Sequence, residues 1–206
     1  MLKIWGRASS VNVQKVLWCA DELGLVYSRV DVGGAFGGTD DPAYLAMNPN
    51  RRVPTLEDGD YAIWGSNSVV RYLAATYGDD RIWPKDPRSR GRADRWMDWQ
   101  LASLSPGMTT LFWGWVRTAP DKRSLDALER ARGEAAGMWK ILDAHLARHE
   151  YLGGQDFTMG DIPAGSMTWR WFQLPIERPD LPHLKRWHDA LARRPGFQKW
   201  VMVTLE

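Results

Sequence analysis

Hydroxyl and amide side chains lie together in the segment Ser9-Ser10-Val11-Asn12. A short apolar run precedes the segment and a helical pattern follows it, so the segment is predicted to join a strand to a helix. Such loops often hold ligands in open α/β sheets. A donor at the positive end of a helix stabilises an anion and lowers the pKa of a thiol. On local sequence alone, a plain helix cap at Ser10 or Asn12 is the simpler interpretation.

Two further segments carry groups that suit a peptide ligand. Val53-Pro54 is predicted to open a strand, and a cis bond there would leave the backbone of Val53 free to pair with an extended peptide. Ser66-Asn67 is predicted to open a helix, where a serine can bind a carboxylate. Taken singly, a trans proline and an ordinary cap are simpler. Together, the three segments lie at strand ends that can converge on one peptide.

The elements that must position these segments follow from hydrophobic patterning. Strands are expected at residues 2–5, 26–32, 53–57 and 61–63, and helices at 13–23, 42–47 and from Ser66 onward. A crossover unit followed by a hairpin predicts an α/β domain with a mixed sheet.

Beyond residue 80 the pattern is helical throughout. Residues 79–87, with two prolines, are expected to form a linker. Thr158 and Asp161 form a variant of the capping box that starts a helix. A last helix over residues 184–191 is expected to stop at Arg194-Pro195-Gly196. The second half is therefore predicted to be a helical bundle.

Composition excludes several classes of protein. The 206 residues carry a net charge of +2, which gives no basic surface for nucleic acid. A single cysteine, Cys19, rules out an intramolecular disulfide framework and is expected in the core. His145 and His149 lack a third metal ligand, so no metal site is predicted. With no apolar segment long enough for a membrane helix or a signal peptide, we expect a cytoplasmic protein without a membrane partner.

Three stretches in order resemble the amino-terminal domain of glutathione transferases: 10–16, 48–56 and 63–73. Residues 157–162 resemble the capping motif of their helical domain. The resemblance covers essentially the whole chain. It implies a thioredoxin-like glutathione-binding domain at residues 1–78 and an all-helical acceptor domain at residues 86–206.

The resemblance also implies roles for individual residues. Ser10 would hold the thiolate of glutathione, with Asn12 beside the sulfur and Ser9 adjacent. The backbone of Val53 would pair with the cysteinyl main chain, next to a cis Pro54. Ser66 would bind the γ-glutamyl carboxylate, with Asn67 next to it in the glutathione site, and Arg52 would lie at the glycyl end.

Two positions depart from the family pattern. Gly65 stands where many members have Glu or Gln, which would bind the γ-glutamyl amine. Arg51 stands where many members have glycine, and it is expected to alter the local turn or to add a positive charge.

The resemblance implies a homodimer that conjugates glutathione to a small hydrophobic electrophile. Glutathione would be a co-substrate, and no permanently bound cofactor is implied. Trp96 and Trp99, which alternate with charged residues, also favour the dimer. The segments 112–115 and 169–172 are aromatic and are expected to contribute to the acceptor pocket. Two alternatives stay open at this point: a glutathione-dependent disulfide reductase or isomerase that uses the same site, and a non-catalytic binding module with this fold.

Overall fold

A computed structural model describes all 206 residues. Its four strands form one mixed sheet in the order β2-β1-β3-β4. β1 is parallel to β2 and antiparallel to β3, and β3 is antiparallel to β4. The strands are β1 (Leu2–Trp5), β2 (Tyr27–Val30), β3 (Thr55–Asp58) and β4 (Tyr61–Trp64). Each expected strand is present, with β2 shorter than its apolar run and β3 beginning two residues later than expected.

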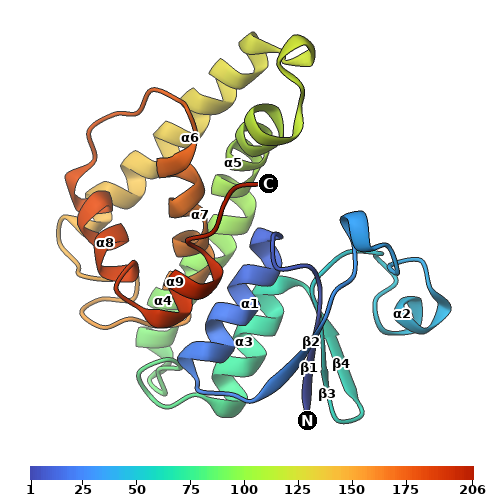
Figure 1. Ribbon diagram of the computed structural model, residues 1–206. Helices are drawn as coiled ribbons and strands as arrows, with labels where there is room; N and C mark the ends of the chain where they lie inside the picture. The colour runs from blue at the N-terminus through green and yellow to red at the C-terminus, as the bar shows by residue number, and fades with distance from the viewer.

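Helices α1 (Val11–Glu22) and α3 (Ser66–Tyr77) pack side by side against the sheet, while α2 (Pro42–Met47) lies on the opposite side (Figure 1). A short 3₁₀ helix, η1 (Gly34–Phe36), connects β2 toward α2. Both α1 and α3 begin at the same edge of the sheet (Figure 1). This is the thioredoxin-like arrangement that was predicted, and it directs two positive helix ends to one place.

The rest of the chain is helical. Four segments follow one another without a break, two of them π-helical: α4 (Pro87–Trp99), η2 (Gln100–Leu104), α5 (Ser105–Phe112) and η3 (Trp113–Arg117). The later segments are η4 (Pro120–Lys122), α6 (Leu125–Leu146), α7 (Asp161–Gln173), α8 (Pro182–Leu191) and α9 (Pro195–Trp200). None of these helices is long and apolar enough to cross a membrane.

One predicted boundary was only half right. Helix α8 ends at Leu191, before the expected stop, but Pro195 then opens the additional helix α9. Proline suits the first helical position because its missing N–H would have no intrahelical partner there. The sequence pattern therefore marked a break between two helices rather than the end of helical structure.

Helix α1 lies at the centre of the molecule. All of its residues from 13 to 20 are buried, since α3 covers one side and α7 and α9 cover the other. The ring of Trp18 packs against Phe197 at 5.0 Å between ring centres. A Cβ at Gly165 or Gly196 would lie 3.0 Å or 2.8 Å from that ring, so both positions need glycine to admit it. One hydrophobic core consequently runs through both halves of the chain.

The interaction predicted between Thr158 and Asp161 is formed, although α7 itself begins at Asp161, so Thr158 lies before the helix rather than at its cap position. A carboxylate oxygen of Asp161 accepts the N–H of Thr158 at 2.9 Å. Its other oxygen accepts from the N–H of Leu152 at 2.9 Å and from Nε1 of Trp187 at 3.0 Å. Burial raises the pKa of Asp161 to about 6, and these donors oppose the shift. The single carboxylate therefore ties the preceding loop and α8 to the first turn of α7.

Candidate active site

A cleft of about 460 Å³ opens where α1 and α3 begin. It contains no carboxylate among its lining residues, and Arg71 at its rim is paired with Asp94 and Asp98. Most of the residues predicted to bind glutathione meet at this cleft: Asn12, Arg52, Val53, Pro54, Ser66 and Asn67.

The backbone before β3 provides a peptide-binding edge. The Val53-Pro54 bond is cis, as predicted. Neither the N–H nor the C=O of Val53 makes a hydrogen bond within the chain. The carbonyl of Arg52 accepts from the hydroxyl of Tyr44 at 2.6 Å and from Nδ2 of Asn48 at 2.7 Å, which holds the loop in place. Val53 can therefore pair with an extended ligand without giving up an existing bond.

The first turn of α3 provides an anion-binding end. Gly65 precedes it with φ of 87°, a left-handed conformation that favours glycine. The backbone N–H groups of residues 66–68 have no partner in the chain. The side chain of Ser66 is buried and its hydroxyl donates to Oδ1 of Asn12 at 3.3 Å. Such a helix end favours a carboxylate through its N–H groups and its dipole.

A buried lysine lies beneath this helix end. Nζ of Lys15 donates to Oδ1 of Asn12 at 3.0 Å and to Oγ of Ser66 at 3.5 Å. It also donates to Oδ1 of Asn67 at 3.3 Å and to Oε1 of Gln100 at 3.0 Å. All four acceptors are uncharged, and Lys15 takes part in no ion pair. The lysine thus lacks the counter-charge that a buried ammonium group ordinarily needs.

The environment of Lys15 makes it titrate near neutrality. Burial, with a smaller contribution from the charge of Arg170, lowers the pKa of Lys15 to about 7. A ligand carboxylate at Ser66 would favour the charged ammonium form. Sequence reasoning missed this residue, because α1 is buried all round and its periodicity gives no sign of where Lys15 points. Gln100 lies in a π-helical turn and was also missed, because nothing in the local sequence shows that it meets Lys15.

Asn67 is oriented differently from the sequence-based expectation. Its Nδ2 donates to the carbonyl of Met97 at 2.7 Å and to Gln100 at 3.2 Å, and its oxygen accepts from Lys15. The side chain is therefore engaged with the helical domain, and its backbone N–H is the group left for a ligand.

Comparisons with known proteins agree with this geometry. Residues 5–81 match the family model "Glutathione S-transferase, N-terminal domain", and residues 106–195 match "Glutathione S-transferase, C-terminal domain". The glutathione S-transferase GstB of Escherichia coli (strain K12) is 39% identical over 205 residues, covering 98% of this chain and 99% of the relative. Glutathione S-transferase 3 of Zea mays is 32% identical over 215 residues, covering 97% and 93%.

A solved structure agrees over the full length. The theta class glutathione S-transferase from Xanthomonas axonopodis pv. citri, a structure with glutathione bound, is 48% identical with a TM-score of 0.96. The match covers 100% of this chain and 99% of that one. This chain belongs to the glutathione S-transferase family. It is an enzyme of that class.

The two departures from the glutathione S-transferase pattern have different structural consequences. Arg51 has a φ of 55°, which is a left-handed conformation that glycine adopts more readily. Its guanidinium pairs with Asp40 at 3.2 Å, so its charge has an acidic partner. At Gly65 no side chain supplies an acid, and the cleft wall has none elsewhere.

The serine loop of this glutathione S-transferase lies beside the cleft rather than in its wall. Ser9 and Ser10 are half-buried and do not line the cleft, whereas Asn12 does. The hydroxyl of Ser10 makes no hydrogen bond within the chain, and Ser10 caps α1 only through its backbone. The carbonyl of Ser9 accepts from the guanidinium of Arg170 at 3.0 Å.

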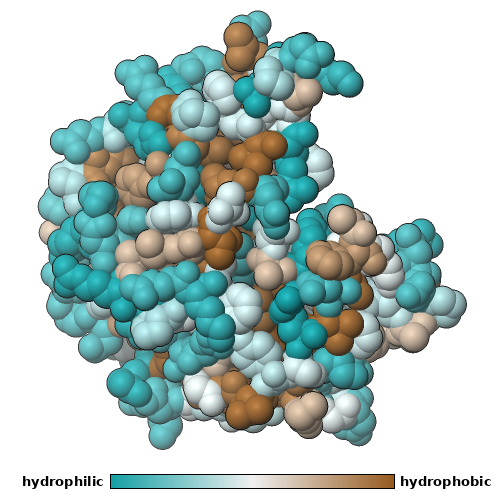
Figure 2. Space-filling model, viewed as in Figure 1, coloured by the Kyte–Doolittle hydropathy of each residue, from teal (hydrophilic) through white to brown (hydrophobic).

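The aromatic segments expected in the acceptor pocket are divided between core and surface, where Trp113 is 59% exposed. Trp171 is fully buried against Trp139, so it belongs to the core. Phe112 is 6% exposed, and Arg170 and Arg117 lie over its ring. Figure 2 shows the surface hollowed between the two domains, on the side where α1 begins.

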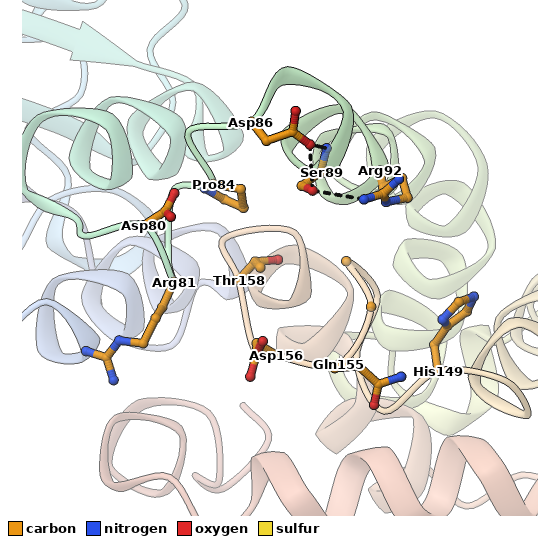
Figure 3. A pocket seen from close by; sticks show the side chains of 12 residues that line it. Asp80, Arg81, Pro84, Asp86, Ser89, Arg92, His149, Gln155, Asp156 and Thr158 are labelled. Atoms are coloured by element: carbon orange, nitrogen blue, oxygen red, sulfur yellow. Dashed lines mark hydrogen bonds between the residues drawn. The ribbon is translucent and has the colours of Figure 1, made fainter.

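Other candidates do not form a site. The thiol of Cys19 is buried, which raises its pKa and removes it from solvent. No group of three or more His, Cys, Asp or Glu side chains could hold a metal ion. A cavity of about 610 Å³ near the start of α4 is polar, and Asp86 there is already bonded to Ser89, which also binds Arg92 (Figure 3). It contains none of the predicted glutathione residues, so its size does not make it the active site.

Proposed function

We propose that this enzyme transfers the thiolate of glutathione to an electrophilic carbon of a small, largely apolar compound. The observation that supports this most is the convergence at one cleft of the unpaired backbone of Val53, the free N-terminus of α3 at Ser66, and Asn12. These three features suit an extended peptide with a carboxylate at one end and a thiol near α1.

The residues divide the work along the ligand. The γ-glutamyl carboxylate lies at Ser66 above Lys15, and the cysteinyl main chain pairs with Val53. Arg52, which is exposed and has no carboxylate partner, meets the glycyl end. The thiol lies at the first turn of α1, where Ser10 and Asn12 donate to the thiolate and the helix dipole favours its charge. The lowered thiol pKa and the positioning of two substrates then accelerate transfer.

We also propose that residues 1–78 hold glutathione and residues 86–206 receive the acceptor. A thermal-shift titration with glutathione tests the first half. A panel of aryl halides, maleyl compounds and mixed disulfides tests the second. A rise in melting temperature together with conjugation of aryl halides supports transfer, whereas no binding at millimolar glutathione contradicts it.

Disulfide reduction at the same site is a second candidate. The position of Asn12 in the cleft wall, with Ser10 outside it, favours it. Release of free thiol from a mixed disulfide, without conjugation of aryl halides, would identify this activity.

A homodimer and a cytoplasmic location complete the proposal. Trp96 does not support the dimer as expected, because it is 7% exposed and packs against Trp99. Better support comes from Trp64 and Leu101, which are 45% and 58% exposed beside the cleft. Sedimentation velocity at micromolar concentration should give a dimer, and Leu101→Glu should shift it toward monomer. A monomeric wild-type protein would contradict the proposal.

A further inference from the structure

Three arginines gather beside the serine loop without an acidic partner. Arg7 precedes the loop, Arg170 comes from α7, and Arg117 ends the π-helical turn η3. None of the three takes part in any ion pair in the structure. The three side chains come from separate parts of the chain, so folding brings their charges together.

The most buried member is anchored and directed at the loop. Arg170 is 9% exposed, and its guanidinium donates to the carbonyl of Ser9 at 3.0 Å. Its Cζ lies 3.8 Å from the ring centre of Phe112, and Cζ of Arg117 lies 5.8 Å from the same centre. Two guanidinium groups therefore lie over one aromatic ring, whose face attracts cations.

The third member, Arg7, packs against the backbone of two glycines. A Cβ at Gly33 would lie 3.1 Å from Nη1 of Arg7, and one at Gly34 would lie 3.1 Å from its Nε. These two glycines, both with positive φ, leave the room that the guanidinium of Arg7 occupies. Packing against them holds Arg7 at the mouth of the loop.

The three charges act on one another. Burial, with smaller contributions from the charges of Arg117 and Arg7, lowers the pKa of Arg170 to about 9. Burial and the charge of Arg117 likewise lower the pKa of Arg7. Clustered cations without a counter-ion cost free energy, so this arrangement destabilises the unliganded protein. An anion bound among them would remove that cost and would be recognised strongly, because guanidinium groups bind carboxylates through paired hydrogen bonds.

We propose that the acceptor substrate carries an anionic group, and that Arg7, Arg117 and Arg170 bind it as a carboxylate beside the sulfur of glutathione. This inference rests on the proposed transfer reaction and names its substrate class: an electrophile with an apolar body and a carboxylate. For an aryl halide of this kind, the thiolate forms the new S–C bond and the C–halogen bond breaks. The halide leaves with the bonding electron pair, the thiol proton goes to solvent, and the carboxylate is unchanged.

A matched pair of product analogues tests the inference by binding. S-(4-carboxybenzyl)glutathione and S-(4-carbamoylbenzyl)glutathione have nearly the same shape and differ in the charge of one group. Calorimetry at pH 7.5 should give the wild-type protein a preference of roughly tenfold or more for the carboxylate, the range for hydrogen bonds to a charged group. Equal affinities, or binding of glutathione but of neither analogue, would overturn the inference. A failure of glutathione itself to bind would instead overturn the proposed function.

Variants show which residues hold the charge. Arg117→Gln, at an exposed position, should fold normally and should remove most of the preference for the carboxylate while leaving the affinity for glutathione unchanged. Arg7→Gln should act in the same direction. Arg193→Gln, which removes an exposed arginine after α8, is the matched control and should keep the full preference. If Arg117→Gln and Arg7→Gln both weaken glutathione itself by as much as they weaken the carboxylate analogue, the arginines bind glutathione and the inference is wrong.

Discussion

The ammonium group of Lys15 donates a hydrogen bond of 3.0 Å to Oε1 of Gln100, and so joins the first helix of the thioredoxin-like domain to the helical domain. The same group reaches Ser66 and Asn12 at the cleft. The charge state of one buried side chain is thereby connected to the ligand site and to the packing between domains. Its pKa of about 7 makes this connection sensitive to pH in the neutral range.

Glutathione affinity should therefore depend on the protonation of Lys15. A bound carboxylate favours the ammonium form, so binding takes up a proton above pH 7 and weakens as pH rises from 7 to 8.5. S-methylglutathione is a suitable probe because it has no thiol to titrate. Calorimetry should show the decline in the wild type and a weaker, nearly flat profile in Lys15→Met. Lys140→Met, at an exposed site, should behave as wild type; a flat wild-type profile would refute the role of Lys15.

The stability of the fold should change with pH in the opposite direction, because of the same residue. The folded-state pKa of Lys15 lies below its unfolded value, so the unfolded chain binds more protons between about pH 7 and 10. The penalty of burying the charge is full below pH 7 and is relieved as pH rises. Urea unfolding of Lys15→Met should show its greatest stability relative to wild type near pH 6, and a smaller relative stability near pH 9. A difference independent of pH would contradict the assignment.

Ser66→Ala should weaken glutathione binding by roughly 1.5–3 kcal/mol, the range for a hydrogen bond to a charged group. The rate of transfer from bound glutathione should change little, because the carboxylate is remote from the sulfur. Thr76→Ala, at an exposed position about three turns further along α3, should leave the dissociation constant unchanged. An unchanged constant for Ser66→Ala would mean that the carboxylate binds elsewhere.

The donor to the sulfur can be identified from paired variants. Ser10→Ala should raise the pKa of bound glutathione and slow the reaction at pH 7, with partial recovery at pH 9. Asn12→Ala should have the smaller effect if Ser10 is the main donor. Stopped-flow spectra of the bound thiolate measure both. A silent Ser10→Ala together with an inactive Asn12→Ala would reverse the assignment and favour disulfide reduction.

Asp161→Ala should destabilise the fold without altering the cleft. Its carboxylate accepts hydrogen bonds from Thr158, Leu152 and Trp187, and their loss leaves buried donors unpaired. The expected cost is about 3–5 kcal/mol, as for breaking a buried charged network. Chemical denaturation measures it, and Asp156→Ala in the preceding loop serves as the control. A loss below about 1 kcal/mol would show that the network is dispensable.

Sequence reasoning was most successful where local patterns carry the information. The four strands, the start of α3 at Ser66 and the interaction between Thr158 and Asp161 all follow from short apolar runs bounded by turn or cap residues. It failed where tertiary contacts decide. Lys15 and Gln100 are far apart in the sequence, and Arg7 lies near Arg117 and Arg170 only because the two parts of the chain pack together. Asn67 looked like a ligand residue because nothing local revealed its contact with Met97.

The ring of Trp18, inserted between Gly165 and Gly196, has a consequence for exchanging parts between related proteins. The chain divides visibly near residue 80, but the core does not divide there. A chimaera that joined residues 1–78 to the helices of a relative would need small residues at both glycine positions to accept the ring. Without them the two parts would be joined correctly along the chain but would not pack together, so recombination at this point succeeds only when the helices keep room for the ring of Trp18.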